Sequence, residues 1–201
     1  MKKFLVLIFI SLPLFAEHLV LNEVSMGSVQ WVEIYNPTSS AISLDGWKIR
    51  NRSGEDVLHG TIAPHSYFLI VNYADNFHVI FPDVTAPIFE PLDHTVGSGL
   101  NRSADMLQLI NPENEVVDQI NWGTPDPSWR YYTVSLWYPG IMVNSDIIAR
   151  IPNGRDRDAS TDWRVPNGPT PGAANPVMSG LDSSSWGKIK AIFGSSGGRF
   201  L

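Results

Sequence analysis

One acidic loop carries the residue types and spacing that a metal site would need. Asp156, Asp158 and Asp162 follow Asn153 closely in the sequence, and Gly154 permits a tight turn after it. Carboxylate and carbonyl oxygens are the ligands that calcium prefers in proteins. We therefore treat Asn153, Asp156, Asp158 and Asp162 as candidate calcium ligands.

The same loop also has a purely structural explanation. Arg155 and Arg157 stand between the acidic residues and could neutralise them in salt bridges. Asp and Ser side chains also bond to the backbone and support turns. The spacing is not that of an EF-hand, and the candidate donors are fewer than the roughly six to eight oxygens that calcium takes. A calcium site and a salt-bridged loop both stay open.

A cluster of aromatic residues is the second candidate binding site. Clustered rings on a loop can form a flat platform for a sugar ring or a hot spot for a protein partner. The alternative is that these rings, together with Trp122, cover the core and bury apolar area there. The candidate ligand-binding residues are Trp129, Tyr131, Tyr132, Trp137 and Tyr138.

The expected β-sandwich, residues 17–175, holds no familiar catalytic motif. A Gly-x-Ser-x-Gly elbow, a His-Glu-x-x-His pair, a P-loop and a dinucleotide-binding glycine pattern are all absent from it. Glu23 and Glu33 could in principle act as paired carboxylates across neighbouring strands. The histidines lack the spacing of metal ligands; they are His18, His59, His65, His78 and His94. We predict that the protein is not an enzyme, with a hydrolase of dispersed residues as one alternative.

The elements that would position these loops show the alternation of β-strands. Trp31, Glu33 and Tyr35 alternate with Val32 and Ile34. Successive strand side chains point to opposite faces, so one register buries Val32 and Ile34. The segment 36–40 contains Pro, Asn and Ser and predicts a turn.

Further strands follow along the chain. A second strand begins near residue 42 and is interrupted by a bulge or tight turn at Asp45-Gly46. The segments 106–110 and 116–122 predict a hairpin. The Pro-rich segment 74–95 predicts a loop packed over one end of the domain. Other expected strands are 19–24, 57–59, 67–72 and 147–151.

These segments resemble the lamin tail domain family, in its bacterial secreted type. The run WVEIYNPTSSAISLDGWKI at residues 31–49 carries the resemblance, and it continues to Pro-Thr-Pro-Gly-Ala-Ala-Asn at 169–175. The resemblance implies an all-β, immunoglobulin-like β-sandwich over about Leu19 to Asn175. It also implies that Glu23 and Glu33 lie on an exposed face and that the Asp-rich loop has a structural role.

Composition fits one folded, exported domain. The chain has 201 residues, of which 43% are hydrophobic and 11% aromatic, so it can bury a core. The formal charge of -6 disfavours a phosphate-backbone binder, and we expect no nucleic-acid partner. Cysteine is absent, which excludes disulfides and thiolate metal sites.

The chain divides into three segments. Residues 1–16 have the pattern of a secretory signal peptide, with Lys2 and Lys3 before an apolar run that Ala16 closes. An N-terminal strand or an uncleaved anchor is the alternative. Residues 17–175 are the expected β-sandwich domain. Residues 176–201 are a Gly/Ser-rich linker and a short amphipathic tail, which could touch a membrane surface or secretion machinery.

These observations favour a non-catalytic binding or structural module. We expect it to be secreted or to lie at the cell surface or in the periplasm, after cleavage near Ala16, with no transmembrane helix in the mature chain. Its expected role is protein–protein interaction or adhesion, with an envelope or extracellular protein, or a glycan, as partner. We expect no cofactor besides the candidate calcium. A carbohydrate-binding module that uses the aromatic cluster is the other alternative.

Overall fold

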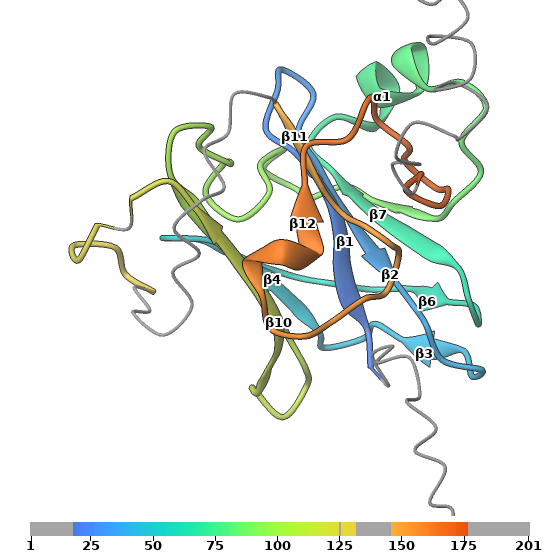
Figure 1. Cartoon of the computed structure of the whole chain (residues 1–201), viewed down its shortest axis with the longest axis horizontal. Helices are drawn as coiled ribbons and strands as arrows, with labels where there is room; N and C mark the ends of the chain where they lie inside the picture. The colour runs from blue at the N-terminus through green and yellow to red at the C-terminus, as the bar shows by residue number, and fades with distance from the viewer. Residues whose placement is uncertain (1–17, 125, 132–145, 177–201) are drawn as a thin grey trace, which may run out of the picture.

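The computed structural model describes residues 18–124, 126–131 and 146–176 (Figure 1). The predicted signal peptide and C-terminal tail lie outside the described residues, and so do Tyr132, Trp137 and Tyr138. Within the described ranges, no helix has the length and apolar character that crossing a membrane requires.

Two β-sheets face each other across a common core (Figure 1). The six-stranded sheet has the order β12 (Trp163–Arg164), β11 (Ile147–Arg150), β1 (Val20–Ser25), β2 (Trp31–Tyr35), β7 (Tyr67–Val71) and β8 (Ile88–Phe89). The four-stranded sheet has the order β10 (Val116–Trp122), β9 (Asp105–Ile110), β4 (Lys48–Arg50) and β5 (Glu55–Val57). The predicted all-β sandwich is confirmed.

The second predicted strand is split between two sheets. Strand β3 (Ile42–Ser43) pairs with β6 (Thr61–Ile62), whereas β4 joins the four-stranded sheet. A tight turn separates β3 from β4: the N–H of Trp47 donates to the C=O of Leu44 at 3.0 Å, and Gly46 has a φ of 83°. The interruption predicted at Asp45-Gly46 is therefore confirmed, and it moves the chain from one sheet to the other.

The core is built from alternate residues of both sheets. Val32 and Ile34 are fully buried, as predicted, and they belong to one apolar cluster with Leu107 and Leu109 of β9. The predicted hairpin is also confirmed, because β9 and β10 pair antiparallel. Trp122, at the end of β10, is buried in the same cluster.

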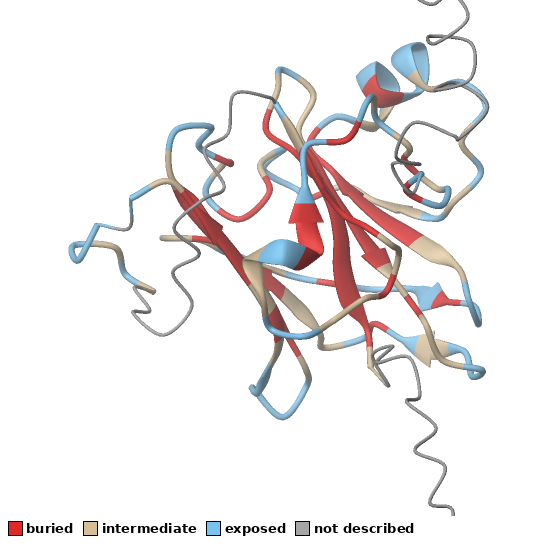
Figure 2. Ribbon diagram, in the orientation of Figure 1, coloured by how far each residue is buried: buried red, intermediate tan, exposed pale blue. Residues whose placement is uncertain are grey.

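The six-stranded sheet is also covered on its outer face (Figure 2). Trp31 points away from the core, yet it is buried and packs edge-on against Phe77 with ring centroids 6.3 Å apart. Phe77 belongs to helix α1 (Ala74–Ile80). The prediction that segment 74–95 is a loop over one end is wrong, because this segment forms α1 and the edge strand β8 and packs on the sheet.

Strand β1 contains a β-bulge. Its register with β2 shifts between Leu21, which lies opposite Ile34, and Glu23, which lies opposite Glu33. The extra residue is Asn22. A bulge bends the strand and leaves backbone groups outside the ladder, so these groups need other partners inside the sandwich.

A buried ion pair satisfies the bulge and ties the two sheets together. Arg150 of β11 donates through Nη2 to both carboxylate oxygens of Asp118 on β10, at 3.0 and 2.8 Å. Arg150 Nε donates to the C=O of Leu21 at 2.9 Å, and the N–H of Leu21 donates to Asp118 at 2.7 Å. The ion pair thus satisfies the N–H and the C=O of Leu21, which the bulge leaves outside the ladder.

We expect Asp118→Ala to lower the free energy of unfolding by about 3–5 kcal/mol, because it removes a buried partner of Arg150 and leaves the buried N–H of Leu21 without its acceptor. Urea unfolding measures the change. The control Glu113→Ala lies at an exposed position in the turn after β9 and should shift stability by less than about 0.5 kcal/mol. Adding Arg150→Met to Asp118→Ala should recover part of the loss. A loss as small as that of the control would contradict the ion pair.

Candidate functional site

The candidate calcium ligands do not converge on one point. Asp156 contacts Nε2 of His18 at 3.3 Å and Nη1 of Arg150 at 3.2 Å. The hydrogen bond from His18 holds the pKa of Asp156 low, at about 2. Asp162, in the 3-10 turn η1 (Ser160–Asp162), is fully buried and accepts from Nε of Arg157 at 2.8 Å. Two of the acidic residues are thus paired with bases.

The other two candidates point elsewhere. Asp158 is exposed, and its N–H donates to Asp156 at 3.2 Å. The Oδ1 of Asn153 accepts from the N–H of Asn175 at 2.7 Å, and its amide nitrogen donates to the hydroxyl of Tyr67. Among the described residues, no group of three or more His, Cys, Asp or Glu side chains is placed to hold a metal ion. Calcium binding at this loop stays a prediction, and these contacts do not favour it.

Two members of the aromatic cluster are described. The N–H of Tyr131 donates to the C=O of Arg52 at 3.2 Å, which packs this loop against the four-stranded sheet. The guanidinium of Arg50 lies 4.2 Å from the centroid of the Tyr131 ring, and that of Arg130 lies 4.9 Å from it. The ring is therefore engaged in cation–π contacts within the chain. Trp129 is half-buried, and its N–H closes a turn on Asp126 at 3.0 Å.

The expectation that Glu23 and Glu33 lie on an exposed face is wrong. Both side chains are fully buried, opposite each other on β1 and β2. The loop 168–175, which contains the Pro-Thr-Pro-Gly motif, covers them: the hydroxyl of Thr170 donates to Glu23 at 3.0 Å, and the N–H of Gly172 donates to Glu33 at 2.6 Å. Asn22 Nδ2 donates to Glu33 at 2.7 Å.

Burial changes the acidity of this pair. It raises the pKa of Glu23 to about 7 and that of Glu33 to about 8. The hydrogen bonds from Thr170, Asn22 and Gly172 act in the opposite direction, but they are the smaller effect. Neither carboxylate forms a salt bridge with a described Lys or Arg side chain, so nothing of that kind offsets the effect of burial on the two pKa values. The closed position suits a structural latch better than a reaction centre.

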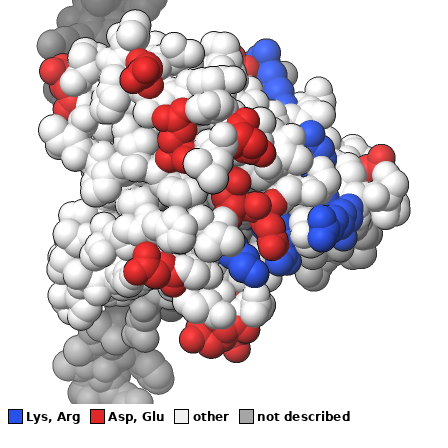
Figure 3. Space-filling view, turned by 180° about the vertical axis from the view of Figure 1, so that it is seen from behind, with Lys and Arg blue, Asp and Glu red and all other residues white. Residues whose placement is uncertain are grey.

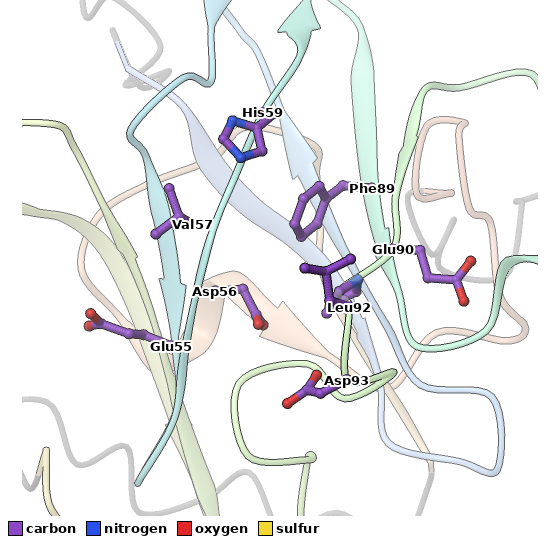
Figure 4. A pocket seen from close by; sticks show the side chains of 9 residues that line it. Glu55, Asp56, Val57, His59, Phe89, Glu90, Leu92 and Asp93 are labelled. Atoms are coloured by element: carbon purple, nitrogen blue, oxygen red, sulfur yellow. The ribbon is translucent and has the colours of Figure 1, made fainter.

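An open groove lies between the free edges of the two sheets (Figure 4). Strand β5 is the last strand of the four-stranded sheet, and β8 is the last strand of the six-stranded sheet. The groove has a volume of about 570 Å³. Its lining comes from β5 and the residues after it (Glu55, Asp56, Val57, His59) and from β8 and the residues after it (Phe89, Glu90, Pro91, Leu92, Asp93).

Apolar side chains open onto this groove. Val57 is 46% exposed and Leu92 is fully exposed at 102%. The ring of Phe89 packs partly on the core and meets the ring of His59 edge-on, with centroids 6.2 Å apart, so the two sheets touch across the groove. Exposed apolar side chains in a concave site indicate a surface that binds another molecule.

Two of the carboxylates beside the groove have basic partners. Glu55 accepts from Nη2 of Arg50 at 2.9 Å, and Glu90 lies 2.8 Å from Nδ1 of His94. The face that Figure 3 shows carries acidic side chains across its middle, with the basic side chains gathered to one side. Negative charge on this face is thus only partly neutralised.

The other two carboxylates, Asp56 and Asp93, form no salt bridge with any described side chain. Asp56 is half-buried and accepts from the N–H of Gly97 at 2.6 Å. Burial raises the pKa of Asp56 to about 6, and the charge of Asp93 raises it as well. Hydrogen bonds from Thr95 lower the pKa of Asp93, so the site beside Asp56 carries a negative charge that would attract a cation.

Sequence reasoning allowed for a pairing of Glu23 and Glu33 across neighbouring strands, but it missed the burial of this pair, and it missed the groove. The burial was hidden because strand alternation cannot show that a sheet is covered on both faces. The groove combines segments 55–59 and 89–93, and no spacing rule connects them. The only signal was the mixture of apolar and acidic residues in Phe89-Glu90-Pro91-Leu92-Asp93.

The buried pair predicts that stability falls as pH rises from about 5 to about 8. In the folded chain Glu23 and Glu33 hold protons up to pKa values of about 7 and 8, whereas an unfolded chain releases them near 4.5. The folded state therefore binds more protons in this window, and its stability is lost as pH rises through the folded pKa values. Urea unfolding at a series of pH values measures the slope.

The double variant Glu23→Gln, Glu33→Gln has no carboxyl to titrate at this place. Its pH dependence above about pH 6.5 should be flatter than that of the native chain, because Asp56, with its pKa of about 6, has by then mostly ionised in both. Glu113→Gln, at an exposed turn, should keep the native slope. An equal slope in the double variant and the native chain would rule out the latch as its cause.

Comparison with known proteins agrees with this architecture. The Lamin Tail Domain family model matches residues 16–124, which is more than half of the chain. A search of curated proteins found no match. The matched range includes β1, β2 and β7 of the six-stranded sheet and all four strands of the other sheet, β10, β9, β4 and β5. The chain therefore belongs to the lamin tail domain family.

Proposed function

We propose that this protein is an exported, non-catalytic module that binds another protein at the cell surface or outside the cell. Family membership supports a binding or structural role. The leader-like sequence of residues 1–16 supports export. The observation that carries the proposal is the groove between β5 and β8, where exposed apolar side chains and two strand edges meet.

The chemistry of the described residues supports binding rather than catalysis. A general acid or base must reach its substrate, and the two glutamates with the strongly raised pKa values are closed under loop 168–175. In the groove, the carboxylates of Glu55 and Glu90 are held by Arg50 and His94. These contacts fix the walls of a surface and leave its apolar side chains free to contact a partner.

Strand edges give such a surface a mode of recognition. An unpaired edge offers a row of N–H and C=O groups that another chain can complete. Proteins usually protect such edges, and β5 is short and carries charged Glu55. Leu92 and Val57 nevertheless leave apolar area in water beside it, which a bound protein would bury.

The proposal is tested by capture of partners from envelope and extracellular extracts on the immobilised mature protein. Leu92→Glu places a charge where apolar contact is expected and should reduce capture at least tenfold, by quantitative mass spectrometry. Val165→Glu is the matched control, because Val165 is 45% exposed but does not line the groove, and it should capture as the native chain does. Absence of any protein captured specifically by the native chain would refute the proposal.

A further inference from the structure

We infer that the groove between β5 and β8 binds an extended segment of a partner protein in which Lys or Arg alternates with apolar residues. The segment adds to the free edge of β5 as a new strand. This inference rests on the proposed function and names the chemistry of the partner.

The backbone of β5 is oriented for this addition. The N–H of Asn51 donates to the C=O of Gly54 at 3.0 Å, and the N–H of Leu58 donates to the C=O of Trp47 at 2.8 Å. In an antiparallel pair the hydrogen-bonded positions alternate, so the backbone of Asp56 also faces β4. The backbone groups of Glu55 and Val57 therefore point away from the sheet, toward the open side of the groove.

The charge of the groove selects a basic side chain. Figure 4 shows the carboxylates of Asp56 and Asp93 pointing into the same space. The other polar side chains around it already have contacts within the chain: Glu55 with Arg50 and Lys48, Glu90 with His94, and His59 with Asp45. A Lys or Arg placed between Asp56 and Asp93 would relieve their repulsion, and it would gain charge-assisted hydrogen bonds.

The apolar side chains select the neighbours of that basic residue. Side chains on a strand alternate between two faces, so the residues on either side of a Lys point away from the two carboxylates. Val57 and Leu92 are exposed beside the groove and can contact such side chains. Alternation of basic and apolar residues therefore matches the groove, whereas blocks of one kind do not.

Binding is tested with a fluorescent peptide, Ser-Lys-Val-Lys-Val-Lys-Ser, and the full chain, by fluorescence anisotropy. We expect saturable binding that weakens as salt rises. Peptides with Glu in place of Lys, with the Lys and Val residues in blocks, or with methylated backbone nitrogens should each bind at least tenfold more weakly. Strand addition would be overturned if the peptide with Lys and Val in blocks, or the methylated peptide, bound as tightly as the alternating peptide. It would also be overturned if the alternating peptide did not bind up to about 1 mM.

Variants of the protein locate the site. The double variant Asp56→Asn, Asp93→Asn should bind the Lys peptide with at least tenfold lower affinity. An unchanged melting temperature of this variant shows that the fold is kept. The control pair Glu113→Gln, Asp126→Asn removes the same charge at exposed positions outside the groove and should bind the peptide as the native chain does. Equal affinity of the Asp56, Asp93 variant and the native chain would overturn the site.

The chain itself contains a competing occupant, the alternating stretch Lys188-Ile189-Lys190. Lys188→Glu with Lys190→Glu should leave peptide affinity unchanged if the groove serves a partner protein. A rise in affinity would instead assign the groove to this stretch of the same chain, and loss of self-association in this variant would assign it to a second copy. Either result overturns a separate partner.

A photoreactive group at His59 separates this inference from the proposed function. We expect the crosslinked peptide from a captured partner to carry the basic–apolar alternation. If the Asp56→Asn, Asp93→Asn variant captures the partner as well as the native chain does, and the partner is crosslinked elsewhere, this site is overturned. The proposal that the protein is a binding module then still stands. Failure to capture any partner would overturn the proposed function itself.

Discussion

The fold depends on how the bulge in β1 is satisfied. The extra residue, Asn22, separates Leu21, which faces the core, from Glu23, which faces outward. The freed N–H and C=O of Leu21 are taken by Asp118 and Arg150, on opposite sheets. An unsatisfied buried backbone group costs as much as a lost hydrogen bond. One irregular residue thus requires an ion pair across the sandwich.

The same bulge organises the outer face. It brings Glu23 opposite Glu33, and two buried carboxylates without a basic partner need donors. The chain provides these donors from Thr170 and Gly172, far away in the sequence. In the groove the situation is reversed, because the carboxylates there stay at the surface. The chain supplies partners for the buried carboxylates of Glu23 and Glu33, whereas Asp56 and Asp93 at the open edge form no salt bridge with a described side chain.

The sequence predicted the parts of the fold that depend on local pattern. Val32 and Ile34 alternate with their neighbours, and Asp45-Gly46 interrupts a strand, so both were predictable. Helix α1 was not, because it is short and is positioned by the contact of Phe77 with Trp31. The family resemblance implied an exposed face for Glu33, but loop 168–175 covers that face. Sites formed by distant segments leave no periodic signal, and this limited prediction of the groove.

The contact between the first strands and loop 168–175 also sets the order in which the domain can be completed. The family match ends at residue 124, yet the donors to Glu23 and Glu33 come from Thr170 and Gly172. In the export that we propose, a chain that crosses the membrane amino end first would deliver both glutamates before Thr170 and Gly172. Until that late segment emerges, the face of β1 and β2 that carries Glu23 and Glu33 stays uncovered. A chaperone or protease could bind this face during that time.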